Sequence, residues 1–394
     1  MTNNGDILNA FDHQPRTRVV FGVGSVDRVG EFARELGATT VLLVTDPGIV
    51  AAGHADRVRH ALEHEGLRVI LFSDVHENPT TRDVANCLEV ARSAPIDLII
   101  GLGGGSSLDT AKGCNFLLTN GGEMRDYWGV GKATKPMLPL IAIPTTAGTG
   151  SECQSFALIA DEHTHQKMAC GDPKAAAKVA ILDPQLTVTQ PRHVAACTGV
   201  DALSHAIESA VCRKQTVLSR MYAREAFRLI AGAFIRVLDR GDDLDARGAM
   251  LLGAAFAGTA IENSMLGAAH SAANPLTARF NVVHGQAVGV MLPHVIAYNA
   301  CDAATARRYA ELASAAGLAD GQDVPAAVDR LIAAVQQMLA AAQVPASLAA
   351  YGVDRDAIPA LAQEAAGQWT AQFNPRNIGA EDFVRLYEEA YSPT

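Results

Sequence analysis

Cysteine pairs, aromatic side chains and clustered positive charge are all scarce in this sequence of 394 residues. The seven cysteines are scattered and form no Cys-x-x-Cys pair, which argues against a disulfide framework or a thiolate zinc site and favours a reducing compartment. The N-terminus, Met-Thr-Asn-Asn-Gly-Asp, lacks the basic and apolar regions of a signal peptide. Apolar runs are interrupted too early to cross a bilayer. We therefore expect a cytoplasmic protein that has no membrane partner.

The charge and the composition narrow the class further. The formal net charge is -10 and there is no basic stripe or tail, so nucleic acid is not expected as a partner. Apolar residues make up 49% and charged residues 19%, which describes a globular protein that buries large cores. The length allows two domains at the usual ~100–200 residues each.

The two halves of the sequence differ in their pattern of apolar residues. Apolar runs at 40–45, 96–100, 138–143 and 179–182 are typical of buried parallel strands, and helical segments separate them. Residues 154–182 are expected to complete the sheet. This alternation predicts a doubly wound α/β domain whose ligands lie at the carboxyl ends of the strands. From Arg192 onward the pattern is helical almost throughout. We expect domains at 1–190 (α/β) and 191–394 (all-helical).

Two polar loops follow strands of the first half. Gly101-Leu-Gly-Gly-Gly-Ser-Ser leads from a strand into a helix that we expect to be capped by serine, as we expect Ser25 to cap an earlier helix. Such a loop presents backbone N–H groups to a phosphate, although a plain tight turn explains it too. Ser106 breaks the Gly-x-Gly-x-x-Gly fingerprint, and no P-loop lysine follows. The second loop, Pro144-Thr-Thr-Ala-Gly-Thr-Gly-Ser-Glu152, fits a polar ligand or a well-bonded turn.

The second half contains a candidate metal site. Asp201 and His205 are four residues apart in a helical segment, which places a carboxylate and an imidazole on one face. His270 follows an apolar stretch, and His284 precedes Gly285 near the start of another helix. One carboxylate and three imidazoles suit Fe(II) or Zn(II). The spacing alone does not decide, because a His in an apolar segment is more often a hydrogen-bonded core residue than a ligand.

The two loops and the Asp201, His205, His270 and His284 set together resemble the iron-containing (group III) alcohol dehydrogenases, which include lactaldehyde reductases and 1,3-propanediol dehydrogenases. The resemblance extends over nearly the whole sequence. It implies an N-terminal dinucleotide domain, a C-terminal helical metal domain and an active site in the cleft between them. The implied function is metal-dependent hydride transfer between NAD(H) and a primary alcohol/aldehyde pair, with a homodimer or larger assembly. A dehydroquinate-synthase-like or glycerol-dehydrogenase-like zinc enzyme is the alternative.

The resemblance also assigns roles to residues. Asp46, at the end of a strand, faces the adenine ribose by this likeness, and its carboxylate would repel a 2′-phosphate, which favours NAD(H) over NADP(H). The other implied cofactor contacts are Asn78, Pro79, Thr80, Gly103, Gly104, Gly105, Ser106, Asp109, Thr145, Thr146, Thr149 and Lys167.

The substrate pocket is expected to involve Gln154, Phe156, Ile261 and Asn274, and these residues do not identify the substrate. Many relatives have a His where this sequence has Asn274, and an amide is no general acid or base near pH 7. Three other histidines are expected to lie outside the metal site: His163 and His165 in a solvated hairpin, and His294 in a structural position.

Overall fold

The computed structural model describes residues 10–164, 166–320 and 322–391. It divides into two compact units. Gln14–Gln190 form an α/β unit, and the described residues from Pro191 onward form a helical unit, to which residues 10–13 also belong. The assignment of domains to 1–190 and 191–394 stays a prediction. His165 lies outside the described residues.

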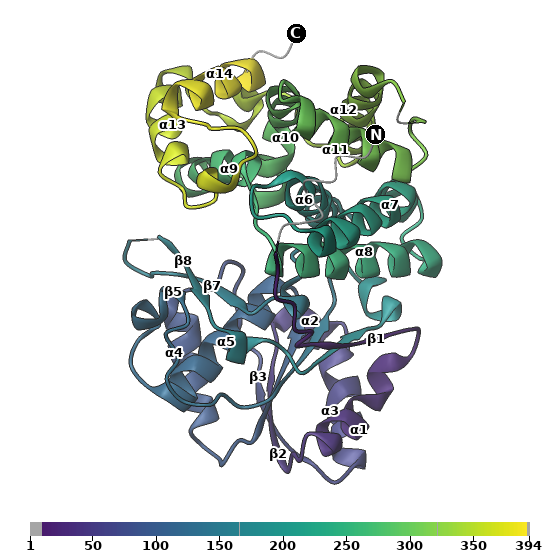
Figure 1. Ribbon diagram of the computed structural model, residues 1–394. Helices are drawn as coiled ribbons and strands as arrows, with labels where there is room; N and C mark the ends of the chain where they lie inside the picture. The colour runs from purple at the N-terminus through teal and green to yellow at the C-terminus, as the bar shows by residue number, and fades with distance from the viewer. Residues whose placement is uncertain (1–9, 165, 321, 392–394) are drawn as a thin grey trace. The chain divides into compact units, whose positions relative to one another are not determined.

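A parallel sheet forms the centre of the α/β unit (Figure 1). Its strand order is β1-β9-β6-β4-β2-β3, and every pair in it is parallel. All residues of β2, β4, β6 and β9 are buried, as the continuous apolar runs predicted. The expected doubly wound sheet is thereby confirmed. The strands are β1 (Arg18–Phe21), β2 (Thr40–Val44), β3 (Arg68–Phe72), β4 (Leu98–Gly103), β6 (Leu140–Pro144) and β9 (Val179–Leu182).

Helices cover both faces of this sheet because alternate side chains of each strand point to opposite faces. Along β2, Leu42 and Val44 join one buried cluster, to which α4 and α5 contribute. Val41 and Leu43 join a second cluster with α1 and α3. The helices are α1 (Val29–Glu35), α2 (Pro47–Ala51), α3 (His54–His64), α4 (Thr81–Ala91) and α5 (Gly105–Asn120).

Residues 154–182 depart from the expectation that they complete the main sheet. Only β9 joins it. The strands β7 (Phe156–Ala160) and β8 (Lys167–Gly171) form an antiparallel hairpin, and with β5 (Gly129–Val130) they make a separate sheet. The reason is visible in β7, where burial alternates along the strand instead of being continuous. That pattern suits a sheet with one solvated face. His163 lies in the exposed turn of this hairpin, as predicted.

Two expected serine caps are wrong. Ser25 lies inside a 3-10 turn whose N-cap is Gly24, and Ser106 lies inside α5 behind its N-cap Gly104. In both places a glycine takes the cap position, so the serine side chain is one or two residues too late to cap. At the start of α4 no glycine intervenes, and Thr80 and Asp83 form a reciprocal capping box.

The described part of the second unit is helical throughout, as expected. Small residues let its helices approach closely: a Cβ on Gly199 of α6 would lie 2.3 Å from the Phe234 ring of α7. No helix among the described residues has the length and hydropathy needed to span a bilayer. The helices are α6 (Arg192–Val211), α7 (Val217–Asp239), α8 (Leu244–Glu262), α9 (Ala268–Phe280), α10 (His284–Ala300), α11 (Ala303–Ala315), α12 (Val324–Ala341), α13 (Ile358–Ala366) and α14 (Ala380–Tyr391).

Candidate active site

The α/β unit gathers its predicted ligand-binding residues where the chain changes direction across the sheet. The chain runs from β2 outward to β3 and then returns to β4 on the other side of β2. Ligands of open α/β sheets bind at such switch points, at the carboxyl ends of the strands. Asp46 follows β2 at this edge, and Gly103 ends β4. The fold therefore places both at the position that suits a dinucleotide.

Asp46 and the glycine loop are joined directly. One Asp46 oxygen accepts the backbone N–H of Ile49 at 3.0 Å and caps α2, while the other accepts the Ser107 hydroxyl at 3.1 Å. Gly103 has a φ of +144°, which disfavours side chains, and a Cβ there would lie 2.5 Å from the Ser107 hydroxyl oxygen. Glycine is thus required at Gly103 both by conformation and by space.

The two polar loops pack against each other. The Thr145 N–H donates to the Gly103 carbonyl at 2.9 Å. A Cβ on Gly105 would lie 2.7 Å from the Thr149 methyl group, and one on Gly104 would lie 3.4 Å from the Thr146 methyl group. The glycines therefore admit the threonine loop to the amino end of α5, whose first-turn N–H groups have no intrahelical acceptors. The result is a backbone-lined cradle of the kind that binds phosphate.

A buried lysine of α5 is hydrogen-bonded to the threonine loop. Lys112 of α5 has no exposed surface, and its ammonium donates to the Ser151 carbonyl, the Ser151 hydroxyl and the Phe156 carbonyl at 2.6–2.9 Å. Asp109 accepts from the Ser151 hydroxyl at 2.7 Å and from the Leu158 N–H at 3.1 Å. Both oxygens of Asp109 are therefore engaged within the protein. Its direct contact with a cofactor stays a prediction.

Three further predicted cofactor residues lie around the same edge. Asn78 has a φ of +54°, and its N–H donates to the Ser106 hydroxyl at 3.3 Å, which links the 76–80 loop to α5. Thr80 forms a bridge with Ala160, and Ala160 pairs with Lys167 across the β7–β8 hairpin. The structure thereby brings the exposed Lys167 close to the Asn78–Thr80 loop, although 87 residues separate Lys167 from Thr80 in the sequence.

The predicted metal ligands converge in the helical unit. Asp201 and His205 share one face of α6, His270 lies in the first turn of α9, and His284 begins α10. The Nε2 atoms of His205, His270 and His284 lie 3.3, 3.4 and 3.7 Å from the same oxygen, Oδ1 of Asp201. Close packing produces this arrangement, because a Cβ on Gly285 would lie only 2.0 Å from the Cys197 carbonyl of α6.

These distances fit a metal-binding cluster. Two ligand atoms at about 2.1 Å from one ion with tetrahedral angles lie about 3.4 Å apart. Asp201 Oδ1 and His270 Nε2 are buried and have no hydrogen-bond partner among the described residues, which is costly unless an ion binds them. His284 is more exposed, at 29% of its side chain, which leaves access from one direction. Asp201, His270 and His284 each offer a ligand atom within 4.8 Å of the other two, so these three fit a divalent ion such as Fe(II) or Zn(II), and His205 adds a ring nitrogen 3.3 Å from Asp201 Oδ1.

The carboxylates and imidazoles of the cluster stabilise one another's charged forms. Burial disfavours the charged form of Asp201, but the neighbouring imidazoles, His205 foremost, outweigh burial and hold its pKa well below the usual range. Burial also disfavours the imidazolium of His270, yet the carboxylates of Glu208 and Asp201 raise its pKa to about 9. The cluster is therefore built around charge pairing and not around an apolar pocket.

Sequence reasoning missed one residue of this cluster, Glu208. Its carboxylate is buried, accepts from His270 Nδ1 at 2.5 Å and accepts the Ala269 N–H at 2.7 Å. A signal was present, because Asp201, His205 and Glu208 occupy positions i, i+4 and i+7 of one helix and so share a face.

The predicted substrate residues divide between the units. Gln154 and Phe156 belong to the α/β unit, where the Gln154 amide donates to the Thr149 carbonyl at 2.7 Å. Ile261 and Asn274 belong to the helical unit, where the Asn274 amide donates to Gln368 at 3.0 Å. Their substrate role stays a prediction.

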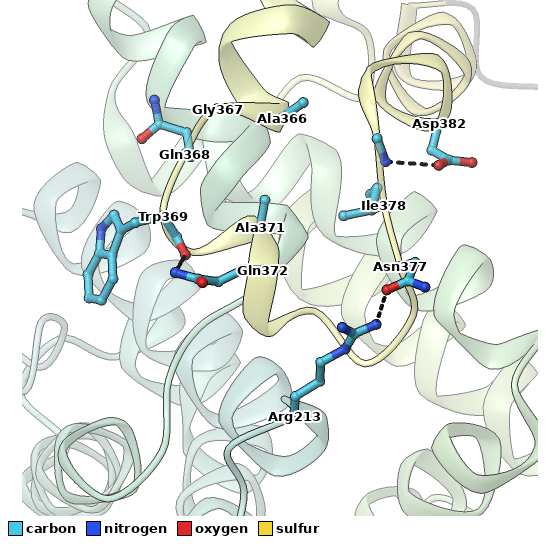
Figure 2. A pocket seen from close by; sticks show the side chains of 11 residues that line it. Arg213, Ala366, Gly367, Gln368, Trp369, Ala371, Gln372, Asn377, Ile378 and Asp382 are labelled. Atoms are coloured by element: carbon cyan, nitrogen blue, oxygen red, sulfur yellow. Dashed lines mark hydrogen bonds between the residues drawn. The ribbon is translucent and has the colours of Figure 1, made fainter.

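Gln368 also lines a pocket of about 620 Å³ in the helical unit. Figure 2 shows Arg213 pointing toward Asn377 across this pocket. None of the metal ligands lines this pocket. It is therefore not the metal centre.

Comparison with known proteins places the site in a family. Residues 15–184 match the family described as "Iron-containing alcohol dehydrogenase", and residues 195–391 match "Fe-containing alcohol dehydrogenase family, C-terminal". The chain belongs to the iron-containing alcohol dehydrogenases. It is 35% identical to the NAD-dependent methanol dehydrogenase of Bacillus methanolicus over 94% of its own length and 97% of the relative's. It has the same identity and coverages with lactaldehyde reductase of Escherichia coli (strain K12).

Solved structures agree with this assignment. A crystal structure of 1,3-propanediol oxidoreductase has a TM-score of 0.93 to this chain at 32% identity, covering 97% of this chain and 100% of that one. The expected family, fold class and enzyme class, an alcohol/aldehyde oxidoreductase, are confirmed. The family name specifies iron and the methanol dehydrogenase is described as NAD-dependent, so the expected cofactors agree with the family as well.

Proposed function

We propose that this protein catalyses alcohol + NAD⁺ ⇌ aldehyde + NADH + H⁺ on a small primary alcohol/aldehyde pair, using an ion held by Asp201, His205, His270 and His284. The observation that carries the proposal is the convergence of three imidazole Nε2 atoms on one Asp201 oxygen at 3.3–3.7 Å. A divalent ion bound there supplies Lewis acidity toward the substrate oxygen. No side chain is needed as a covalent nucleophile.

The protein's own residues hold the reactants. The N–H groups at the start of α5, with Gly103, Gly104 and Gly105, would bind the pyrophosphate of the cofactor, and the glycines leave room for its close approach. Thr145, Thr146 and Thr149 are proposed to line the nicotinamide side, because their loop packs on these glycines. Asn78, Pro79, Thr80 and Lys167 are proposed to lie at the adenosine side.

Asp46 is proposed to select NAD(H). Its carboxylate lies beside the glycine loop and is partly exposed, so it can accept a hydrogen bond from a ribose hydroxyl. A 2′-phosphate brought to the same place would be repelled.

Asn274 is not proposed as a proton donor. Its amide has no titratable proton near pH 7 and already donates to Gln368. We propose that it lines the substrate site together with Ile261, Gln154 and Phe156. A cytoplasmic location and a homo-oligomeric state are proposed on the cysteine pattern and the family likeness.

The test is reconstitution. Metal-stripped protein is loaded anaerobically with Fe(II) or with Zn(II), and NADH oxidation is followed with a panel of short and medium aldehydes. The proposal predicts turnover that depends on added metal, with a preferred aldehyde that identifies the substrate class. Absence of turnover with both metals while NADH is bound would contradict it. NADH that is bound but never consumed would instead favour the dehydroquinate-synthase-like alternative.

A further inference from the structure

The amino end of α9 lacks a cap of its own. Its N-cap residue is Gly267, which has no side chain to accept the first N–H groups of the helix. Acceptors come instead from other segments. Asn374 accepts the Ala268 N–H at 3.3 Å, and Glu208 of α6 accepts the Ala269 N–H at 2.7 Å. A Cβ on Gly267 would lie 3.2 Å from both of these acceptor oxygens, so the glycine gives them access.

Glu208 does more than cap this helix. Its second oxygen lies 2.5 Å from Nδ1 of His270, the residue that follows Ala269. The opposite ring atom, Nε2, faces Oδ1 of Asp201 at 3.4 Å. The ring of His270 is therefore held between two carboxylates. It packs against His205 at 4.9 Å between ring centroids, with the planes 17° from parallel.

We propose that Glu208 is the positioning residue of the metal centre, because it fixes His270 with the proton on Nδ1 and the lone pair of Nε2 directed at the ion. Histidine ligands of metals in general donate their second N–H to a carboxylate or a carbonyl, which sets the ring orientation and increases the basicity of the ligand. The Glu208 carboxylate supplies that acceptor here, and it binds the backbone of the adjacent residue as well. The inference rests on the proposed metal-dependent function.

The substitution Glu208→Gln tests this geometry sharply. The two groups that face Glu208, Ala269 N–H and His270 Nδ1–H, are both donors, and a carboxylate has an acceptor oxygen for each. A glutamine has one acceptor oxygen and one NH₂ donor in nearly the same shape. If its oxygen accepts from Ala269, its NH₂ meets Nδ1, and His270 must then place the proton on Nε2, where it competes with the ion. The other orientation sets the NH₂ against the Ala269 N–H.

The measurement is metal affinity, not turnover. Zn(II) and Co(II) binding is measured by competition with a chelator, and the Co(II) absorption spectrum reports the ligand field. We expect Glu208→Gln to weaken metal binding about 10- to 100-fold and to change the Co(II) spectrum. NADH affinity should stay within about twofold, because the predicted NADH contacts belong to the α/β unit. Glu208→Asp keeps two acceptor oxygens and should recover part of the loss.

A matched control uses another buried carboxylate. Asp183 of the α/β unit is fully buried and accepts the N–H groups of Gln185 and Val26 at 3.1 and 3.3 Å. Asp183→Asn therefore disturbs a comparable pair of hydrogen bonds and should leave metal affinity unchanged. Equal losses in Glu208→Gln and Asp183→Asn would show a general effect of destabilisation and would overturn the proposal. Metal binding by Glu208→Gln within twofold of the unsubstituted protein would also overturn it.

A second measurement does not depend on the variant folding. In the unsubstituted protein loaded with Zn(II), ¹H–¹⁵N spectra of labelled histidine should show a ring with a proton on Nδ1 and a metal-bound Nε2, whose Nδ1 proton is close to the Ala269 amide proton. A His270 ring bound through Nδ1 would contradict the proposal. Failure of the unsubstituted protein to bind any metal would instead refute the proposed function itself.

Discussion

Each unit of this protein buries an acidic side chain, and the two respond to burial in opposite ways. Asp201 of the helical unit and Glu152 of the α/β unit are 7% and 2% exposed. The imidazoles around Asp201 outweigh the cost of burial and hold its pKa well below the usual range. Around Glu152 burial prevails, the charge of Lys112 offsets it only in part, and the pKa rises to about 7. Asp201 is therefore held ionised beside the imidazoles, whereas Glu152 changes its charge near pH 7.

The two units also differ in how their proposed sites are built. The proposed metal site of the helical unit depends on a few side chains that converge on one point, whereas the proposed cofactor site of the α/β unit is distributed over backbone groups and glycines. Loss of one ligand from a concentrated site removes its function. A change in a distributed site reduces binding by degrees. The predictions below test this difference.

The largest effect is expected from the metal ligands. His270→Ala or His284→Ala removes an imidazole from the set around Asp201. Because Lewis-acid stabilisation is worth several kcal/mol, turnover should fall by roughly 10³-fold or more, with loss of retained metal by elemental analysis. NADH affinity, measured by fluorescence titration, should change little. His163→Ala, in the exposed β7–β8 turn, is the matched control and should retain both metal and turnover. Lost NADH binding with metal retained would contradict the assigned roles.

The glycine cradle should give a graded loss. In Gly105→Ala the new methyl group would lie 2.7 Å from the Thr149 methyl group, so the two loops must separate. Overpacking of this kind costs about 1–3 kcal/mol, and we expect NADH affinity to fall roughly 10- to 100-fold with metal content unchanged. Adding Thr149→Ser removes the opposing methyl group and should restore part of the affinity.

A glycine elsewhere controls for this experiment. Gly232 of α7 has open space where a Cβ would lie, so Gly232→Ala should alter neither NADH nor metal binding. If Gly105→Ala binds NADH as tightly as the unsubstituted protein, close packing of the two loops is not what forms the cofactor site.

The sequence predicted the parts of both sites that depend on local pattern. The glycine loop was located because a buried run ends at it, and Asp201 and His205 were paired by helical spacing. Asp46 also ends a buried run, but its cofactor role was expected only through the resemblance to a family. The approach of His270 and His284 to Asp201 depends on the packing of α9 and α10 against α6, such as the fit of Gly285 on Cys197. Spacing along the chain does not encode that packing. The four residues were grouped as a candidate metal site from the sequence, and the resemblance to a family decided between that site and separate core histidines.

The missed features share a different cause. Ser25 and Ser106 are good capping residues, but the preceding glycines occupy the cap positions, and sequence pattern locates helix ends only to within a residue or two. The β7–β8 hairpin was assigned to the main sheet because its short apolar segments are compatible with either kind of strand. Glu208 was overlooked because its partner, His270, belongs to another helix, and the sequence pattern does not show that the two side chains are in contact.

A smaller effect is expected on the choice of cofactor. Asp46→Asn keeps an oxygen that can accept the Ile49 N–H, and its NH₂ can donate to the Ser107 hydroxyl oxygen, but it removes the charge that would repel a 2′-phosphate. The ratio of kcat/KM for NADP(H) to that for NAD(H) should rise about 10-fold, which corresponds to about 1.4 kcal/mol. Asp46→Gly should raise it too, with an added loss of stability because the cap of α2 is lost. An unchanged ratio in both variants would show that Asp46 does not face the adenosine ribose.

The smallest effect on activity is expected from Glu152, a buried acid to which the proposed function gives no role. The pKa of Glu152 is about 7 in the fold and about 4.5 in the unfolded chain, so the folded state holds more protons between these values. Stability should therefore fall as pH rises through this window, and the loss should be complete above pH 7. Glu152→Gln removes the ionisation, so its advantage should grow from near zero at pH 4.5 to roughly 3 kcal/mol at pH 8.

Urea unfolding of both proteins at a series of pH values measures this difference, and Glu63→Gln on the exposed surface of α3 is the control. An offset that is constant with pH would show that Glu152 is ionised in the fold throughout. The same series on an Asp201 variant would confound ionisation with metal loss. The pKa of Glu152 responds first to burial and is lowered by a backbone hydrogen bond and by the charge of Lys112, so Glu152 is the cleaner measure of what burial does to a carboxylate in this protein.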